Sequence, residues 1–179
     1  RKEIRSKLNI EDNCLLIGNI ARYHPTKDHD NLLEALFLLK SFQVNFKCIL
    51  IGAGLSNNNV DLSEKIMKLD LNNEIILYGR SFEIHKILNA FDINVLSSRK
   101  EAFPMSLLEA MAVDIPCIST NVGDAKEIIG ETGWTIDISD PLSLALQLRE
   151  VSEKRFILNE KSLLTRRRVK DNFSLDIMN

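Results

Sequence analysis

The sequence predicts an α/β fold, a doubly wound parallel sheet of about six strands with helices on both faces. Short apolar runs alternate along the chain with longer amphipathic stretches, which is typical of strand–helix–strand units. The apolar runs are continuous, as expected for strands that are buried on both faces of a parallel sheet. With 179 residues, 45% of them hydrophobic and 27% charged, the chain suits one globular domain with a sizeable core.

The first half of the chain is expected to alternate strands with helices. Each apolar run ends in polar or glycine-containing residues that favour a turn, and a stretch with helical spacing follows. Asp28-His29-Asp30 is interpreted as a helix cap, because an aspartate side chain accepts hydrogen bonds from the free amides at a helix start. The expected strands are 14–20, 46–52 and 74–78, and the expected helices are 30–40, 61–69 and 84–91.

The second half continues this alternation. Pro104 and Pro141 each mark the first turn of a helix, where the amide hydrogen that proline lacks is not needed. The expected strands are 92–98, 116–120 and 133–138. The expected helices begin at Pro104, after Gly123, at Pro141 and at 153, and the last of them is charged and extends to 170.

Residues 1–12 predict a short helix or a linker. The chain begins with Arg1, without an initiator methionine, inside a charged stretch that has helical spacing. We therefore interpret residues 1–12 as a linker or leading helix from a missing N-terminal domain, and residues 13–179 as one domain.

The composition excludes several classes of function. A net charge of −2 provides no basic field for nucleic acid. No apolar run is long enough to span a membrane, no signal peptide is evident, and the histidines lack the spacing of metal ligands. We therefore expect no metal. Cys14, Cys48 and Cys117 lie inside expected strands and form no C-x-x-C pair, which is typical of buried, reduced thiols in the cytoplasm.

Two glutamates, Glu101 and Glu109, organise the predicted site. They follow the expected strand 92–98, and the helix that begins near Pro104 lies between them. Amides just after Pro104 would point out of the helix start, which favours phosphate binding. Taken singly, a glutamate in the first turns of a helix more often marks a solvated surface. The pair indicates a ligand that offers hydroxyl groups as well as phosphate, as a nucleotide sugar does.

Further candidates follow the other expected strands. Ligands of open α/β sheets bind at the carboxyl ends of the strands, so residues just after each strand are expected to converge. Gly52-Ala53-Gly54 lacks the third glycine of the dinucleotide fingerprint, which disfavours a redox enzyme. The candidates are Arg22 and Lys27 after the first strand, Gly52 and Gly54 after the second, Gly79 and Arg80 after the third, and Gly123 after the fifth.

With these motifs the chain resembles the C-terminal, donor-binding domain of a GT-B fold glycosyltransferase, in the retaining class called glycosyltransferase family four. The resemblance covers nearly the whole chain. It rests on the family's E-x7-E motif, formed here by Glu101 and Glu109, and on a basic pair after the first strand, formed by Arg22 and Lys27. The implied fold is the Rossmann-like half of GT-B, and residues 13–179 would bind the nucleotide-sugar donor.

The resemblance implies roles for these four residues. Arg22 and Lys27 would bind the diphosphate of the donor and count, with Glu101, as catalytic. Fixed cations favour the transition state, in which charge builds on the leaving nucleoside diphosphate, without a metal or other cofactor. Glu101 would lie beside the transferred sugar, and Glu109 would accept hydrogen bonds from the ribose hydroxyls.

Backbone groups are implied to complete the donor site. The loop amides of Phe103 and Met105, on either side of Pro104, would hold sugar or phosphate oxygens. The turn at Gly79, Arg80 and Ser81 matches the place where backbone groups of the family hold the base.

The implied function is transfer of a hexosyl-type sugar from a nucleoside-diphosphate sugar, such as a UDP- or GDP-sugar, to a glycan or lipid-linked acceptor in surface polysaccharide biosynthesis. The cleft would be shared with the missing N-terminal domain, so this chain alone would bind nucleotide but transfer nothing. Two alternatives stay open: a GT-B fold nucleotide-sugar epimerase, and a non-catalytic nucleotide-binding homologue.

The expected location is the cytoplasm. The basic run from Arg166 to Lys170 could contact anionic lipid at the inner face of the cytoplasmic membrane. Such a run is more often the solvated face of a terminal helix.

Overall fold

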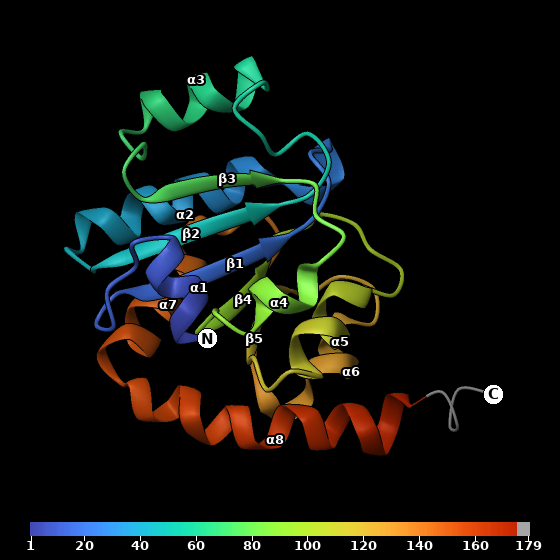
Figure 1. Cartoon of the computed structure of the whole chain (residues 1–179). Coiled ribbons are helices and arrows are strands. Elements are labelled where there is room, and N and C mark those ends of the chain that lie inside the picture. The colour runs from blue at the N-terminus through green and yellow to red at the C-terminus, as the bar shows by residue number, and fades with distance from the viewer. Residues whose placement is uncertain (175–179) are drawn as a thin grey trace.

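The computed structural model describes residues 1–174 and contains one six-stranded sheet in the order β3-β2-β1-β4-β5-β6. Every strand pairing is parallel, as predicted, and the arrows of β1, β2 and β3 in Figure 1 point the same way. The strands are β1 Leu15–Ile20, β2 Phe46–Ile51, β3 Ile75–Gly79, β4 Ile93–Leu96, β5 Cys117–Thr120 and β6 Trp134–Ile136.

Helices cover both faces of the sheet, so the doubly wound prediction is confirmed. One apolar cluster contains the buried side chains of α2, α3 and α7, and a second contains those of α4, α5 and α6. The helices are α1 Lys2–Lys7, α2 His29–Ser41, α3 Val60–Lys68, α4 Ile84–Leu88, α5 Met105–Met111, α6 Ala125–Ile129, α7 Pro141–Glu153 and α8 Arg155–Phe173, with short 3-10 helices η1 Pro25–Lys27 and η2 Gly130–Thr132.

The central strand β1 shows why the apolar runs of the sequence are continuous. Successive side chains of a strand point to opposite faces of the sheet. Leu15 and Ile17 therefore enter the first apolar cluster and Leu16 the second, and all three are fully buried. The ring of Phe91 packs directly on the backbone of Gly18, where a Cβ atom would lie 1.9 Å from the ring. Burying each such apolar side chain stabilises the fold by about 1.5–3 kcal/mol.

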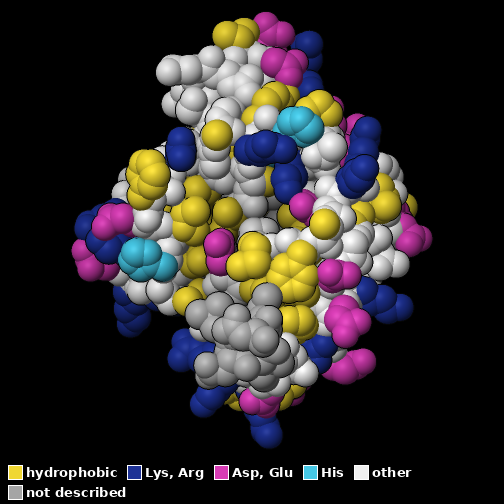
Figure 2. Space-filling view, turned by 90° about the vertical axis from the view of Figure 1, so that its right-hand side faces the viewer, with side chains coloured by type: hydrophobic (Ala, Val, Ile, Leu, Met, Phe, Trp, Pro, Cys, Tyr) yellow, Lys and Arg dark blue, Asp and Glu magenta, His cyan; other side chains and the backbone are white. Residues whose placement is uncertain are grey.

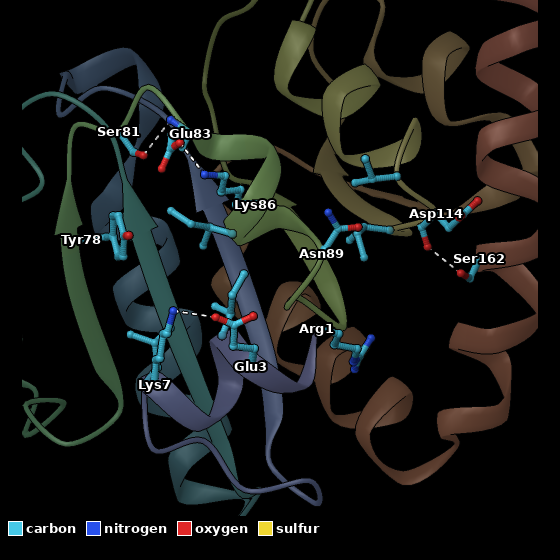
Figure 3. Close-up of a pocket in the computed structure, with 15 residues that line it drawn as sticks. Arg1, Glu3, Lys7, Tyr78, Ser81, Glu83, Lys86, Asn89, Asp114 and Ser162 are labelled. Atoms are coloured by element: carbon cyan, nitrogen blue, oxygen red, sulfur yellow. Dashed lines mark hydrogen bonds and ion pairs between the residues drawn. The ribbon is translucent and has the colours of Figure 1, made fainter.

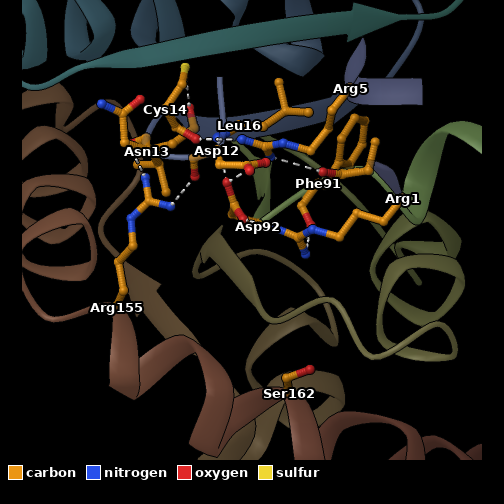
Figure 4. Close-up of polar contacts among 12 residues, drawn as sticks. Arg1, Arg5, Asp12, Asn13, Cys14, Leu16, Phe91, Asp92, Arg155 and Ser162 are labelled. Atoms are coloured by element: carbon orange, nitrogen blue, oxygen red, sulfur yellow. Dashed lines mark hydrogen bonds and ion pairs between the residues drawn. The ribbon is translucent and has the colours of Figure 1, made fainter. Parts of the chain in front are cut away.

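A buried guanidinium attaches the segment of residues 1–12 to the sheet (Figure 4). Arg5 donates to the carbonyl oxygens of Glu11 and Cys14, at 2.7 Å each, and its guanidinium lies 3.2 Å from the carboxylate of Asp92. The same carboxylate accepts a hydrogen bond from the Leu16 amide at 2.7 Å. Helix α1 therefore packs near the start of β1.

The last helix, α8, is attached to the domain through its basic side chains. Arg168 donates to the carbonyl oxygen of Ile128 at 2.8 Å, near the end of α6, and Arg166 lies 2.7 Å from Asp114. Arg166 is nevertheless 61% exposed, as expected for a solvated basic face, whereas Arg168 is only partly exposed because its guanidinium lies against the end of α6. Arg167 does point outward and is exposed. No helix within residues 1–174 has the length and apolar character needed to cross a bilayer.

Candidate functional site

The predicted catalytic residues follow the two strands between which the strand order reverses. The sheet order places β1 between β2 and β4, so connections leave β1 and β4 in opposite directions along the sheet. The carboxyl ends of these two strands form the topological switch point at which α/β sheets bind ligands. Residues 21–28 follow β1, and residues 97–104 follow β4. Figure 2 views this end of the molecule, where charged side chains of both signs lie among hydrophobic ones near the centre of the face.

Lys27 and Glu101, one from each loop, form an ion pair. The Nζ atom of Lys27 lies 2.5 Å from Oε1 of Glu101, and the Ser98 hydroxyl donates to the same oxygen at 2.6 Å. The two side chains are only 21% and 11% exposed, so their attraction is screened less than on an open surface. The structure thus brings two of the three predicted catalytic residues into direct contact.

Arg22, the third predicted catalytic residue, is exposed at the start of the loop after β1. Its guanidinium has no hydrogen bond or ion pair with any other residue in the range 1–174. The loop packs on the neighbouring one, where the Tyr23 amide donates to the carbonyl of Ala53 at 2.7 Å. This approach requires a glycine, because a Cβ on Gly52 would lie 1.9 Å from the Ala21 carbonyl oxygen. Gly52 therefore serves loop packing.

Helix α5 carries the remaining residues of the motif. It begins at Met105, and Pro104 is its N-cap with an extended ψ of 89°, so the prediction of Pro104 inside the first turn is wrong by one residue. No side chain caps the helix start. Glu109 is exposed, and partial burial raises the pKa of its carboxyl group. Phe103 packs edge-to-face on Phe173 of α8, with ring centroids 6.3 Å apart.

Gly79 and Arg80 form the turn after β3. Gly79 has a φ of 75°, which favours glycine. Its amide donates to the Leu55 carbonyl at 2.7 Å, and its carbonyl accepts from the Gly52 amide at 2.9 Å. Its backbone groups are therefore engaged within the protein, and a ligand would meet the residues that follow. The Arg80 side chain is exposed and lies over the ring of Phe82, 5.0 Å from its centroid.

Gly123 supports the Glu101 loop from the side of β5. A Cβ on Gly123 would lie 2.2 Å from the Ala102 carbonyl oxygen, and the Asp124 amide donates to that oxygen at 3.0 Å. The sequence predicted Gly123 as a residue at the carboxyl end of a strand. Its close approach to Ala102 is a contact between distant segments, which only the folded structure shows.

Sequence reasoning missed one contact at the site, between Asp28 and Arg99. Asp28 was predicted as a helix cap, and the structure confirms this, because its carboxylate accepts from the Asn31 amide at 3.4 Å. The same carboxylate lies 2.6 Å from Nε of Arg99. No sequence signal links these residues, which lie 71 positions apart.

A cavity of about 820 Å³ lies elsewhere, beside α1, α4 and the loop after α5 (Figure 3). Its lining includes Glu3, Lys7, Tyr78 and Lys86, and also Ser81 from the predicted base-holding turn, but no predicted catalytic residue. In the part of the chain that the structure describes, no three His, Cys, Asp or Glu side chains are grouped so that they could hold a metal ion.

Comparisons with known proteins agree with the fold and identify the family. A family model described as "Glycosyl transferases group 1" matches residues 1–171. The capsular polysaccharide biosynthesis glycosyltransferase CapM of Staphylococcus aureus is 26% identical over 94% of this chain and 44% of its own. The crystal structure of a glycosyltransferase from Rickettsia africae superposes with a TM-score of 0.89, at 27% identity, over 99% of this chain and 48% of that one.

A further solved structure shares the fold. HepE of Anabaena, in complex with UDP-glucose, matches with a TM-score of 0.81 and 22% identity, over 93% of this chain and 48% of that one. In each of these comparisons the chain spans less than half the length of the protein that it matches.

Proposed function

Because the chain belongs to the family of glycosyl transferases group 1, we propose that it is the donor-binding half of a retaining enzyme. In this proposal the enzyme transfers a hexosyl-type sugar from a nucleoside-diphosphate sugar to a glycan or lipid-linked acceptor. The observation that carries the proposal is the placement of Arg22, Lys27 and Glu101 on the two loops of the switch point, with Lys27 and Glu101 in contact. The cleft would be completed by an N-terminal half.

The two cations suit the chemistry of the leaving group. When the bond between the sugar and the β-phosphate oxygen breaks, its electron pair stays on the nucleoside diphosphate. Arg22 has an unpaired guanidinium among the described residues, and Lys27 is held in place by Glu101. Fixed positive groups of this kind stabilise developing charge without reorganising during the reaction. We therefore assign diphosphate binding to Arg22 and Lys27 and propose that the reaction needs no metal.

The two glutamates are assigned to the hydroxyl groups of the donor. One carboxylate oxygen of Glu101 accepts hydrogen bonds from Lys27 and Ser98. No described residue donates to the other oxygen, and we propose that it accepts a hydrogen bond from the transferred sugar. Glu109 is exposed, burial of part of its carboxyl group raises its pKa, and it has no hydrogen bond in residues 1–174. A carboxylate in this state gains hydrogen bonds from ribose hydroxyls, and we assign that role to it.

Backbone amides complete the proposed donor site. The start of α5, at Phe103 and Met105, has no side-chain cap and is assigned to sugar or phosphate oxygens. The base is assigned to backbone groups after Gly79, at Arg80 and Ser81, because those of Gly79 are already engaged. HepE binds UDP-glucose, and we propose a UDP-sugar as donor here.

CapM acts in capsule synthesis, and we propose a surface polysaccharide as the product here. All three cysteines are free and buried, which fits the reducing cytoplasm that we propose as the location. Arg167 is exposed, and we propose that it can contact anionic lipid at the inner face of the membrane.

Nucleotide binding tests the proposal. Thermal unfolding of the chain would be followed with millimolar UDP, GDP, ADP and NAD. A ligand at 100 times its dissociation constant adds about 2.7 kcal/mol to the free energy of unfolding. We expect UDP to raise the melting temperature, Arg22→Ala and Glu109→Ala to reduce the shift, and their charge-matched controls Lys100→Ala and Glu160→Ala to keep it. Absence of any shift in both the chain and the full-length gene product would overturn the proposal.

A transfer assay tests the division into halves. The chain alone is expected to release no sugar from UDP-sugar donors to acceptors, whereas the full-length gene product is expected to do so. Transfer by the chain alone would show that no second half is needed.

A further inference from the structure

We propose that Asp28 and Arg99 are positioning residues that hold Lys27 against Glu101 in the donor site. The inference rests on the proposed function, since it concerns the same two loops. Neither residue belongs to the predicted set of diphosphate, sugar or base contacts. Asp28 directly follows Lys27, and Arg99 precedes Glu101 by two positions, so each lies next to a site residue.

The need for such a contact follows from the sheet itself. β1 and β4 are paired only through Ile17 with Ile93 and Gly18 with Asn94, although both strands continue beyond these residues. Toward the carboxyl ends the ladder is replaced by a side-chain bond, in which the Asn19 amide donates to the Val95 carbonyl at 2.9 Å. Backbone pairing therefore does not set the distance between the loops that follow β1 and β4.

Contacts between these two loops set the distance between them instead. The Ser97 hydroxyl donates to the Lys27 carbonyl at 3.1 Å, and the Arg99 amide donates to the Thr26 carbonyl at 2.8 Å. The ion pair between Arg99 and Asp28, at 2.6 Å, joins the same two loops as the Lys27–Glu101 pair. Two ion pairs and two hydrogen bonds to backbone carbonyl oxygens therefore join the loops.

Asp28 is built into the fold in a way that makes it a firm anchor. It is 3% exposed, its φ of 50° lies in the left-handed region that aspartate tolerates, and its carboxylate caps α2. The Ser139 hydroxyl donates to the carboxylate oxygen that binds Arg99, at 3.2 Å. Arg99 is the only cation paired with this carboxylate among the described residues. Its own side chain is 57% exposed, so it can be replaced without opening the core.

The experiment measures UDP binding to the chain by calorimetry for Arg99→Ala, with Lys100→Ala as the control. Lys100 is the next residue, is exposed, and has no ion pair in residues 1–174, so the control removes the same charge from the same loop. Because small misplacements of a site residue weaken function strongly, we expect Arg99→Ala to raise the dissociation constant about tenfold more than Lys100→Ala. Arg99→Lys is expected to restore most of the affinity, and Asp28→Asn, which keeps the cap, should reproduce the loss.

A double-mutant cycle separates positioning from a general effect on stability. If Arg99 acts through Lys27, Arg99→Ala should change UDP affinity less than about twofold when Lys27→Ala is already present. Full additivity of the two substitutions, or an Arg99→Ala protein that binds UDP like Lys100→Ala, would overturn the proposal.

A second measurement needs no ligand, so it distinguishes failure of this inference from failure of the proposed function. Hydrogen exchange of the ligand-free chain should be faster at the amides of 97–103 in Arg99→Ala than in Lys100→Ala, by about tenfold. Unchanged exchange would overturn the positioning role even if UDP binds. If exchange is faster in Arg99→Ala but the wild-type chain binds no nucleotide, the Asp28–Arg99 pair still orders the loop. The proposed function is then wrong, and the pair does not serve a donor site.

Discussion

Replacing Glu101 with glutamine separates the two roles that we assign to the Lys27–Glu101 pair. Glutamine has the same shape and can still accept a hydrogen bond from Lys27, but it carries no charge. The substitution therefore leaves the geometry of the loop largely in place and removes the negative charge that lies 2.5 Å from the Lys27 ammonium. Binding of the diphosphate and handling of the sugar should then change in opposite directions.

The expected magnitude follows from the distance and the exposure. Two unit charges about 4 Å apart attract by about 4 kcal/mol at an effective dielectric constant of 20. Both groups lose hydration when they pair, so the net value of this partly buried contact is about 1–2 kcal/mol. A bound diphosphate competes with Glu101 for Lys27 and is repelled by its charge. Relief of about 1 kcal/mol in Glu101→Gln corresponds to about fivefold tighter binding of UDP.

The assay is calorimetric titration of the chain with UDP and of the full-length gene product with UDP and a UDP-sugar, with Glu127→Gln as an exposed control. Lys27→Ala should weaken UDP binding by about tenfold or more, because a charge-assisted hydrogen bond is lost. Glu101→Gln should tighten UDP binding, reduce the preference for UDP-sugar over UDP, and lower transfer. If Glu101→Gln weakens UDP binding as much as Lys27→Ala does, the carboxylate only positions the lysine and our reasoning is refuted.

Three further predictions concern stability. Burial lowers the pKa of His29 from 6.5 to about 4, so unfolded but not folded chains take up this proton as the pH falls from about 6.5 to 4. The free energy of unfolding should drop across that window by about 3 kcal/mol more in the wild type than in His29→Leu, and equal drops in urea titrations at pH 7.5 and 4 would contradict this. Gly123→Ala places a Cβ 2.2 Å from the Ala102 carbonyl oxygen at a φ of 48°, so we expect a loss of about 1–3 kcal/mol together with weaker UDP binding. Unaltered UDP affinity in Gly123→Ala would show that the contact between Gly123 and the Glu101 loop does not affect nucleotide binding. Arg5→Met leaves Asp92 and three carbonyl oxygens short of a partner and should cost about 3 kcal/mol in urea unfolding, whereas exposed Arg167→Met should cost less than about 0.5 kcal/mol.

Several elements were predictable because their signals are local. Each buried strand needs an apolar run, so strands such as β1 and β2 stand out in the sequence. The motif residues Arg22, Lys27 and Glu101 follow directly on strands, and the carboxyl ends of parallel strands meet at one edge. The placement of their loops at one edge of the sheet could therefore be inferred before the fold was known. The start of α5 was misplaced by one residue because proline suits both the N-cap and the first turn.

Contacts between distant segments could not be predicted in this way. The Asp28–Arg99 pair spans 71 positions and the Arg5–Asp92 pair spans 87. An aspartate before a helix predicts a cap whether or not an arginine lies across from it. The cations of α8 had the composition of a solvated face, yet Arg168 binds a carbonyl oxygen near the end of α6. Which partner a charged side chain finds depends on how the segments pack.

The sequence by itself thus determined a parallel sheet covered on both faces, the alternation of strands and helices along the chain, and the side chains that follow the strands, because hydrophobic periodicity and turn chemistry act over a few neighbouring residues. Only the tertiary structure decided that Lys27 is paired with Glu101, that the Gly79 amide is already engaged, and that the loops after β1 and β4 are joined by contacts outside the sheet ladder. The physical reason is that ion pairs and hydrogen bonds act over a few ångströms, and distances on that scale between remote residues exist only once the chain has folded.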